Sequence, residues 1–174
     1  MAAAAGPYRA GLENPLAGAV LQPTGGTTGP SKAGLYTHRS LEMMFLSLRE
    51  CFRFTPDSRV LAAAPLTHAG GIVALACLCC GGRVVVTNLT TPGQALDEIE
   101  RERITHLFLP PTLLYVLINE MQAAPRDVSS LKRIMTGAAP VAPDKVKEAT
   151  RLFGPVMAEG YGSTENGSPV LWKH

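Results

Sequence analysis

Charged residues are scarce in this sequence of 174 residues, at 17% of the total. Sixteen Lys and Arg against fourteen Asp and Glu give a net charge of +2, and no run of like charges concentrates that excess. A nucleic acid or an anionic membrane surface is usually bound through a concentrated basic patch, so the sequence indicates neither partner. Because 46% of the residues are hydrophobic, the chain has enough apolar material for a core, which excludes general disorder.

Long apolar runs are also missing. The longest, Ile72–Cys80, holds nine residues, whereas a helix that spans a bilayer needs about 20. This run therefore predicts a buried helix and no transmembrane segment. Residues 1–5 lack the basic stretch and the apolar core of a signal peptide. These absences predict a cytoplasmic protein.

Cysteines are few, and their spacing does not fit a zinc site. Cys77, Cys79 and Cys80 lie inside the apolar run, and Cys51 lies alone in a segment with helical periodicity. No second cysteine pair or histidine stands at the spacing of a zinc finger. We predict reduced thiols in the core, which again favours the cytoplasm.

Short apolar segments alternate with segments of helical periodicity. This alternation predicts an α/β domain with a mostly parallel β-sheet flanked by helices. In such sheets, ligands bind beyond the carboxyl ends of the strands. The segments that follow expected strands are therefore candidates for a site: 24–32, 65–71, 137–140 and 160–165. The expected strands are 17–21, 59–64, 83–87, 105–109, 132–136 and 155–159, and the expected helices are 37–52, with Thr37 as N-cap, 71–80, 92–103, 112–122 and 143–153.

Residues 24–32 contain three Gly, three Thr and one Lys in nine positions. Glycines let backbone N–H groups converge on an anion, and hydroxyls and a lysine add donors, so the segment is suited to a triphosphate. It is not a Walker motif, because Ser31 precedes Lys32 and Ala33 follows it, and no dinucleotide fingerprint is present. Composition alone also fits a flexible linker.

The other three candidate segments are less specific when each is taken alone. His68 follows an expected strand, although a lone histidine is often only structural. The small residues 137–140 allow either a closely lined pocket or a tight turn. Tyr161, Thr164 and Glu165 offer an aromatic face, a hydroxyl and a carboxylate suited to Mg²⁺. The Gly-x-Ser-x-Gly elbow of serine hydrolases is absent.

Taken together and in this order, the four segments resemble the motifs of the adenylate-forming family of acyl-CoA synthetases. They read Thr-Gly-Gly-Thr-Thr-Gly with a following Lys, Pro-Leu-x-His, Gly-Ala-Ala-Pro and Gly-Tyr-Gly-x-Thr-Glu. The resemblance extends from about Ala17 to Glu165. It implies that a small-molecule carboxylic acid is activated with ATP and Mg²⁺ as an acyl-adenylate, then transferred to coenzyme A as co-substrate.

The resemblance also implies a role for each matching residue. Lys32, Thr164 and Glu165 would be catalytic, with Thr164 at the α-phosphate and Glu165 holding the metal. Gly25 and Ser31-Lys32-Ala33 depart from the usual hydroxyl residue and Pro-Lys-Gly of the family. The other implied roles are β- and γ-phosphate binding by Thr24, Gly25, Gly26, Thr27, Thr28, Gly29 and Lys32, adenine stacking by Tyr161 between Gly160 and Gly162, lining of the adenine and acyl pockets by Gly137, Ala138, Ala139 and Pro140, and acyl carboxylate binding by His68.

Family members are much longer than this chain. The resemblance therefore implies an N-terminal tail at 1–16, part of an adenylation domain at 17–165 and a truncated end at 166–174. The ribose-binding Asp, the hinge and the Lys-bearing C-terminal domain of the family would lie beyond His174, so we expect the isolated chain to adenylate poorly. Surfaces exposed by truncation would allow a homo-oligomer. The alternative is a non-catalytic, nucleotide-binding remnant, and fatty, aryl and other acids all remain open.

Overall fold

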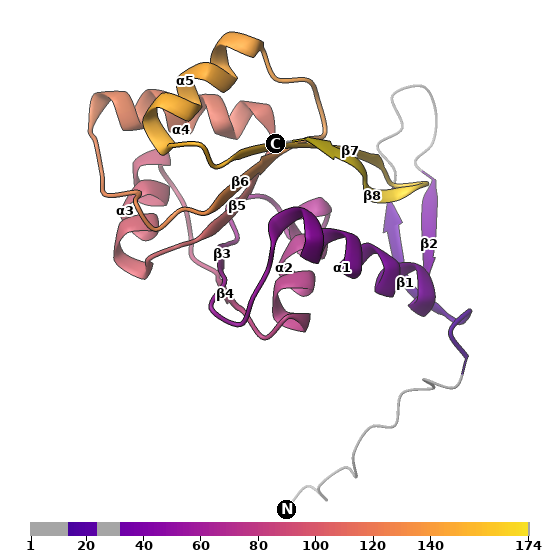
Figure 1. Cartoon of the computed structure of the whole chain (residues 1–174). Coiled ribbons are helices and arrows are strands. Elements are labelled where there is room, and N and C mark those ends of the chain that lie inside the picture. Colours follow the sequence, from indigo (N-terminus) through magenta and orange to yellow (C-terminus); the bar gives the residue numbers. More distant parts are fainter. Residues whose placement is uncertain (1–13, 24–31, 174) are drawn as a thin grey trace, which may run out of the picture.

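The computed structural model describes residues 14–23 and 32–173. The Gly/Thr segment is therefore seen only at its two ends, and the phosphate-binding residues predicted at Thr24–Gly29 lie outside the described residues. The chain forms a central β-sheet with helices on both faces, together with a small separate hairpin (Figure 1). This architecture confirms the predicted α/β fold.

The central sheet has the strand order β4-β3-β5-β6-β7-β8. All neighbouring pairs run parallel except the last, in which β8 is antiparallel to β7. Four of the five parallel strands are short, with three or four residues each, and β7 has seven. The strands are β3 (Arg59–Leu61), β4 (Arg83–Val85), β5 (His106–Leu109), β6 (Arg133–Thr136), β7 (Met157–Ser163) and β8 (Gly167–Lys173).

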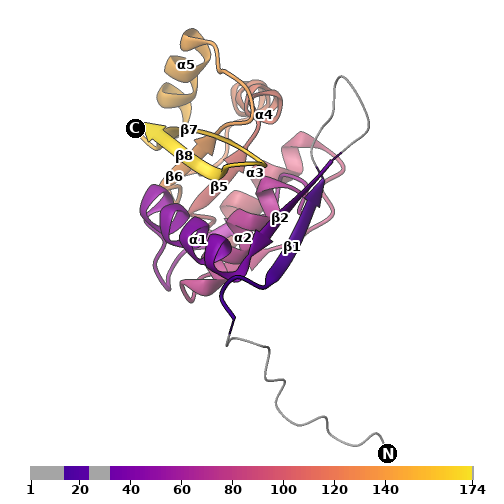
Figure 2. The ribbon, with the colours of Figure 1, turned by 90° about the vertical axis from the view of Figure 1, so that its right-hand side faces the viewer.

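The helices form two layers, and each layer packs on its own hydrophobic core (Figures 1 and 2). Because side chains alternate along a strand, Leu61 and Ile134 face one core while their neighbours Val60 and Met135 face the other. One layer consists of α1 (His38–Phe52) and α2 (Ala69–Cys79), and the other of α3 (Pro92–Glu102), α4 (Pro111–Ala123) and α5 (Pro143–Phe153).

The ends of the helices follow local sequence signals. The Thr37 hydroxyl accepts a hydrogen bond from the Ser40 backbone N–H at 3.2 Å and so caps α1. Prolines occupy the first position of α3 and of α5, where no N–H is needed. Gly154 follows α5 with a φ of 84°, in the left-handed region that favours glycine. These observations confirm the predicted helix starts and the stop at Gly154.

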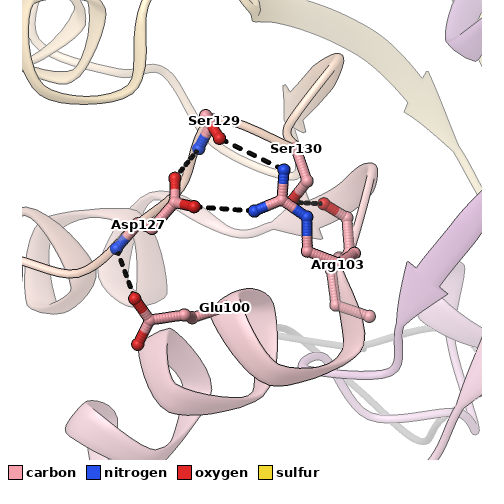
Figure 3. A network of polar contacts seen from close by, with 6 residues as sticks. Glu100, Arg103, Asp127, Ser129 and Ser130 are labelled. Atoms are coloured by element: carbon pink, nitrogen blue, oxygen red, sulfur yellow. Dashed lines mark hydrogen bonds and ion pairs between the residues drawn. The ribbon is translucent and has the colours of Figure 1, made fainter.

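The segment between α4 and β6 is held to the end of α3 by a polar network (Figure 3). Arg103 adopts a φ of 51° and donates to Asp127 Oδ2 at 2.7 Å and to Ser129 Oγ at 3.2 Å. The Asp127 backbone N–H donates to Glu100 Oε1 at 3.0 Å. Hydrogen bonds from Ser129 and then Arg103 lower the pKa of Asp127 to about 2, so this carboxylate stays ionised. The network fixes where the chain enters β6.

The first predicted strand is not part of the parallel sheet. β1 (Gly18–Pro23) pairs antiparallel with β2 (Ala33–Thr37) in a separate two-stranded sheet. β2 was not predicted from the sequence, because this strand has only five residues, includes Gly34 and runs directly into α1. The Gly/Thr segment therefore follows a strand, as predicted, but it connects two antiparallel strands of the separate sheet.

The chain also stays extended for longer than predicted at its C-terminal side. β7 continues through Ser163, so Gly160, Tyr161 and Gly162 lie in a strand rather than in a loop. The chain then turns and returns as β8, a strand that was not predicted. Only the residues from Thr164 to Asn166 form the connection.

The apolar run that was predicted to be a buried helix is buried on one side only. Cys77 is buried, whereas Leu75, Leu78 and Cys79 are exposed. Burial raises the pKa of Cys51 to about 12 and that of Cys77 to about 11, so both remain thiols. The core location is thus confirmed for these two and wrong for Cys79. None of the helices in the described ranges has the length and apolar character needed to cross a bilayer.

His106 is a buried polar residue inside the α1–α2 core. Its Nδ1 lies 2.6 Å from the Thr105 hydroxyl, and its Nε2 lies 3.0 Å from the Phe52 carbonyl oxygen. Because a carbonyl only accepts, Nε2 carries the hydrogen and Nδ1 accepts from Thr105. Burial lowers the pKa of His106 from 6.5 to about 4. The ring is therefore neutral in the folded protein.

This shift predicts a loss of stability in acid. The unfolded state binds a proton at His106 below pH 6.5 while the folded state resists it down to about pH 4. The contribution is fully present above pH 6.5 and is lost as the pH falls toward 4, by about 3 kcal/mol. Urea unfolding across this range should show the loss in the wild type and a flatter profile in His106→Gln. If the free energy of unfolding of His106→Gln fell with pH as steeply as that of the wild type, the prediction would be contradicted. His68→Gln, which changes an exposed histidine, serves as the control.

Candidate functional site

The order of the strands places a ligand site at one edge of the sheet. The chain leaves β3 and reaches its neighbour β4 through α2 on one face, then passes through α3 on the other face to β5, on the opposite side of β3. The direction of winding thus changes between β3 and β5. Parallel sheets bind ligands in the crevice at such a switch point, beyond the carboxyl ends of the strands.

A cavity of about 500 Å³ lies at this edge. It is bounded by the carboxyl ends of the central strands, by α1 and α2, and by the end of β1. Seven residues predicted from the sequence come together in its lining. They are His68, Gly137, Ala138, Gly160, Gly162, Thr164 and Glu165.

One end of the cavity is polar and carries the exposed Glu165. Hydrogen bonds from its own backbone N–H and from the Ser163 hydroxyl, followed by the positive charge of Lys32, lower the pKa of Glu165. Glu165 is therefore ionised at neutral pH, and Lys32 lies close enough to act on it. Lys32 and Glu165, far apart in the sequence, are thus neighbours in the structure, next to Thr164.

The hairpin is attached to this polar end by Tyr36. The buried Tyr36 hydroxyl donates to the Thr164 carbonyl oxygen at 2.7 Å. A Cβ atom at Gly34 would lie 3.1 Å from Thr164 Cγ2, so β2 packs closely against the β7–β8 connection. Pro23 at the end of β1 also lines the cavity. Both ends of the Gly/Thr segment are therefore held beside the polar end.

Much of the remaining lining is apolar, apart from Gln22 and His68. Met44 and Leu48 come from α1, Ile72 and Val73 from α2, and Met135 from β6. All five are buried. An apolar wall with a few convergent polar groups at one end is typical of a small-molecule binding site.

Tyr161, Ala139 and Pro140 do not line this cavity. Tyr161 follows Met157 and Glu159 on one face of β7, whereas Gly160 and Gly162 line the cavity on the other. The Tyr161 side chain is 65% exposed. Of the residues predicted at 160–162, Gly160 and Gly162 thus lie on the cavity side of β7 and Tyr161 lies on the other side.

The backbone links these two sides at the end of β6. Thr136 pairs with Glu159, so Gly137 lies beside Gly160, and a Cβ atom at Gly137 would come within 2.8 Å of the Gly160 carbonyl oxygen. Ala138, one residue on, adopts a φ of 70°, which is strained for a residue with a side chain. Residues 138–140, which follow the Gly137–Gly160 contact, are exposed.

Tyr36 and Met44 are lining residues that were not predicted as part of the site, for different reasons. Tyr36 lies on the unpredicted β2, and its partner Thr164 is distant in the sequence, so no local pattern identified it. Met44 lies in the segment 37–52 that was predicted to be a helix, and its face of that helix serves both the core and the cavity. Helical periodicity gives the orientation of such a face and not its role.

Comparison with known proteins gives a consistent result. Residues 7–174 match the family described as AMP-binding enzyme. The chain is 35% identical to a medium/long-chain-fatty-acid–CoA ligase, FadD8, of Mycobacterium tuberculosis over 82% of this chain and 25% of the ligase. It is also 35% identical to a feruloyl-CoA synthase of an Amycolatopsis species over 87% of this chain and 31% of the synthase.

Solved structures show the same similarity. The amide bond synthetase McbA from Marinactinospora thermotolerans superimposes with a TM-score of 0.78 and 32% identity, over 87% of this chain and 30% of McbA. ATP-bound MatB from Rhodopseudomonas palustris gives a TM-score of 0.77 and 29% identity, over 87% of this chain and 30% of MatB. The chain thus spans between a quarter and a third of the length of the relatives named here.

Proposed function

We propose that this chain, which belongs to the AMP-binding enzyme family, forms the nucleotide- and acyl-binding part of an ATP-dependent acyl-CoA ligase. In the proposed reaction, a carboxylate oxygen attacks the α-phosphorus of ATP and pyrophosphate leaves. The thiol of coenzyme A then attacks the acyl carbon of the acyl-adenylate, which forms the thioester and releases AMP. The observation that carries this proposal is that Thr164 and Glu165 line the cavity and that Lys32 lies close enough to Glu165 to act on its charge.

Lys32 and the Gly/Thr segment are proposed to bind the β- and γ-phosphates of ATP. Backbone N–H groups and hydroxyls of Thr24–Gly29 would surround the phosphates, and the lysine would offset their charge as pyrophosphate leaves. The support is positional, because Tyr36 and Pro23 hold both ends of the segment at the cavity. Thr164 is proposed to donate its hydroxyl to the α-phosphate.

The residues present fit a magnesium ion bound together with the nucleotide. In residues 14–23 and 32–173, no group of three or more His, Cys, Asp or Glu side chains gathers as a metal site. Mg²⁺ is commonly held by one or two carboxylates plus substrate phosphates. Glu165, ionised and exposed, would supply the carboxylate. When bound, the ion would neutralise phosphate charge.

The remaining predicted residues take positions around the nucleotide and the acid in this proposal. Tyr161 offers an exposed aromatic face for adenine, next to the exposed backbone of 138–140. His68 lines the cavity and is proposed to contact the acid carboxylate. The division into a tail at 1–16, a partial adenylation domain at 17–165 and an end at 166–174 remains a proposal of the same kind.

Because the chain corresponds to only part of its relatives, the proposal is best tested by nucleotide binding. Isothermal titration should show that the chain binds Mg·ATP, and that Lys32→Ala and Glu165→Gln each weaken binding about tenfold or more, since each removes a charged contact. The Glu165→Gln effect should vanish when ATP is titrated without Mg²⁺. Lys132→Ala, an exposed lysine at the start of β6, should bind as the wild type does.

The alternative, a remnant of the fold without a working site, makes the opposite prediction. A folded wild type that binds no Mg·ATP would support it. Equal binding by the wild type and both site variants would contradict the proposed roles of Lys32 and Glu165.

A further inference from the structure

A second groove lies outside the candidate site, on the layer formed by α1 and α2. It has a volume of about 690 Å³ and is bounded by α1, by residues 54–56 and by the end of α2. Of the described residues that line this groove, none also lines the cavity at the carboxyl edge of the sheet. Phe45 and Leu46 contribute apolar surface to the groove, and Glu42 and Arg49 contribute opposite charges.

The apolar surface continues from the groove onto α2. This helix contains no charged residue, and it packs beside α1 in the same layer (Figures 1 and 2). A helix that is apolar all round is normally buried, yet Leu75, Leu78 and Cys79 are exposed. Their spacings of three and four residues place them on one stripe, and Cys79 joins this stripe to the groove. An exposed apolar face of this kind is typical of a protein–protein contact.

The two charges are placed symmetrically along α1. Glu42 and Arg49 are about two helical turns apart, so both side chains leave the helix on the same side, with Phe45 and Leu46 midway between them. Within the described residues Glu42 forms no ion pair, and the only ion pair of Arg49 is a long one, from its Nε to Glu50 Oε1 at 3.8 Å. Both charges are exposed and can pair with groups outside this chain.

We propose that this face binds a second copy of the same chain, with the two α1 helices packed antiparallel about a twofold axis. An antiparallel pairing centred between Phe45 and Leu46 brings Glu42 of each copy opposite Arg49 of the other. It also brings Phe45 of each copy against Leu46 of the other. Such an interface is self-complementary, as a closed dimer requires. A parallel pairing would instead place Glu42 opposite Glu42 and Arg49 opposite Arg49, which is unfavourable.

In this dimer the apolar contacts provide most of the affinity and the charges determine the orientation. Exposed ion pairs add little to affinity, whereas like charges placed opposite each other strongly oppose association. One face of two helices is smaller than the interface of a permanent dimer, so we expect a dissociation constant of about 10 μM or higher. Unfolding experiments at about 1 μM chain therefore report on the monomer.

Reversing either charge tests the inference on the chain itself. Sedimentation velocity from about 1 to 200 μM should show the wild type changing from monomer to dimer. Glu42→Arg and Arg49→Glu should each raise the dissociation constant at least about tenfold, because each places like charges opposite each other at both ends of the interface. Val116→Asp changes an exposed apolar residue in the other helical layer and should dimerise as the wild type does. Circular dichroism checks that each variant is folded.

A mixture of the two charge variants gives the sharpest test. Positions 42 and 49 are both positive in the Glu42→Arg chain and both negative in the Arg49→Glu chain, so one copy of each pairs favourably at both ends. The mixture should therefore dimerise at least as tightly as the wild type, and the double variant should dimerise as the wild type does. A wild type that stays monomeric at every concentration would overturn the inference. Dimers that persist in both single variants, or a mixture that stays monomeric, would also overturn it.

This inference does not depend on the proposed function. Glu42 and Arg49 do not line the cavity at the carboxyl edge of the sheet, so both single variants should bind Mg·ATP as the wild type does. Dimerisation without nucleotide binding would contradict only the proposed function, and nucleotide binding by a strictly monomeric chain would contradict only the dimer.

Discussion

Replacing Phe52 with alanine is expected to lower the free energy of unfolding by about 3–5 kcal/mol. Phe52 is the last residue of α1 and has no exposed surface. Its ring stacks on Phe54 with centroids 4.8 Å apart, and it packs beside His106. Removing the ring leaves a cavity between the helix layer and the sheet that neighbouring side chains fill only in part.

Urea unfolding followed by circular dichroism measures this loss. The midpoint should fall while the slope with urea stays constant, because the change affects stability rather than the surface exposed on unfolding. Leu46→Ala on the same helix is the matched control, since Leu46 is 45% exposed and should cost less than about 1 kcal/mol. If Phe52→Ala lowered the free energy of unfolding as little as Leu46→Ala does, this core would be shown not to be tightly packed.

The second large effect is expected at Gly71, in the first turn of α2. A Cβ atom there would lie 1.9 Å from the Leu66 carbonyl oxygen, a backbone atom that cannot move away alone. Gly71→Ala should therefore displace the turn that carries His68 and cost about 1–3 kcal/mol or more. Because His68 lines the cavity and is proposed to contact the acid carboxylate, binding of the acid should weaken as well.

Gly93→Ala provides the control for this substitution. Gly93 also lies in the first turn of a helix, but the nearest atom to an added Cβ is Glu120 Oε2 at 3.6 Å. Alanine there should be neutral or should stabilise the chain by up to about 1 kcal/mol, because it lowers the entropy of the unfolded state. If Gly71→Ala proved as stable as Gly93→Ala, the close packing of the 65–68 turn on α2 would be refuted.

Local signals in the sequence were sufficient to predict the parallel strands and the starts of the helices. Short apolar runs marked β5 and β6, and Thr37, Pro92 and Pro143 marked helix ends, because capping and proline geometry act within a few residues. The positions of the site motifs followed from the same strands. His68 and Gly137 lie at the carboxyl edge of the sheet, as the topology of a parallel sheet requires.

Pairing between distant segments could not be predicted in this way. Nothing near β1 shows that its partner is β2 rather than a strand of the main sheet. The extension of β7 through Tyr161 depends on β8, with which Tyr161 pairs through Leu171. The face on which Tyr161 lies follows from this extension. The sequence therefore predicted candidate site residues and left open the surface on which each one is presented.

The hydrogen bond between Tyr36 and Thr164 also bears on the order in which the molecule folds. These residues are 128 positions apart in the chain, and closing so long a loop is entropically unfavourable until the intervening strands and helices have formed. During synthesis β1 and β2 are made before Thr164, so Tyr36 has no hydrogen-bond partner at first. The β-α-β units that lie between Tyr36 and Thr164 in the chain can form from contacts that are closer in sequence. The polar end of the cavity is completed only when β7 and β8 have paired. The nucleotide binding proposed for this chain would therefore report on the folding of nearly the whole described chain.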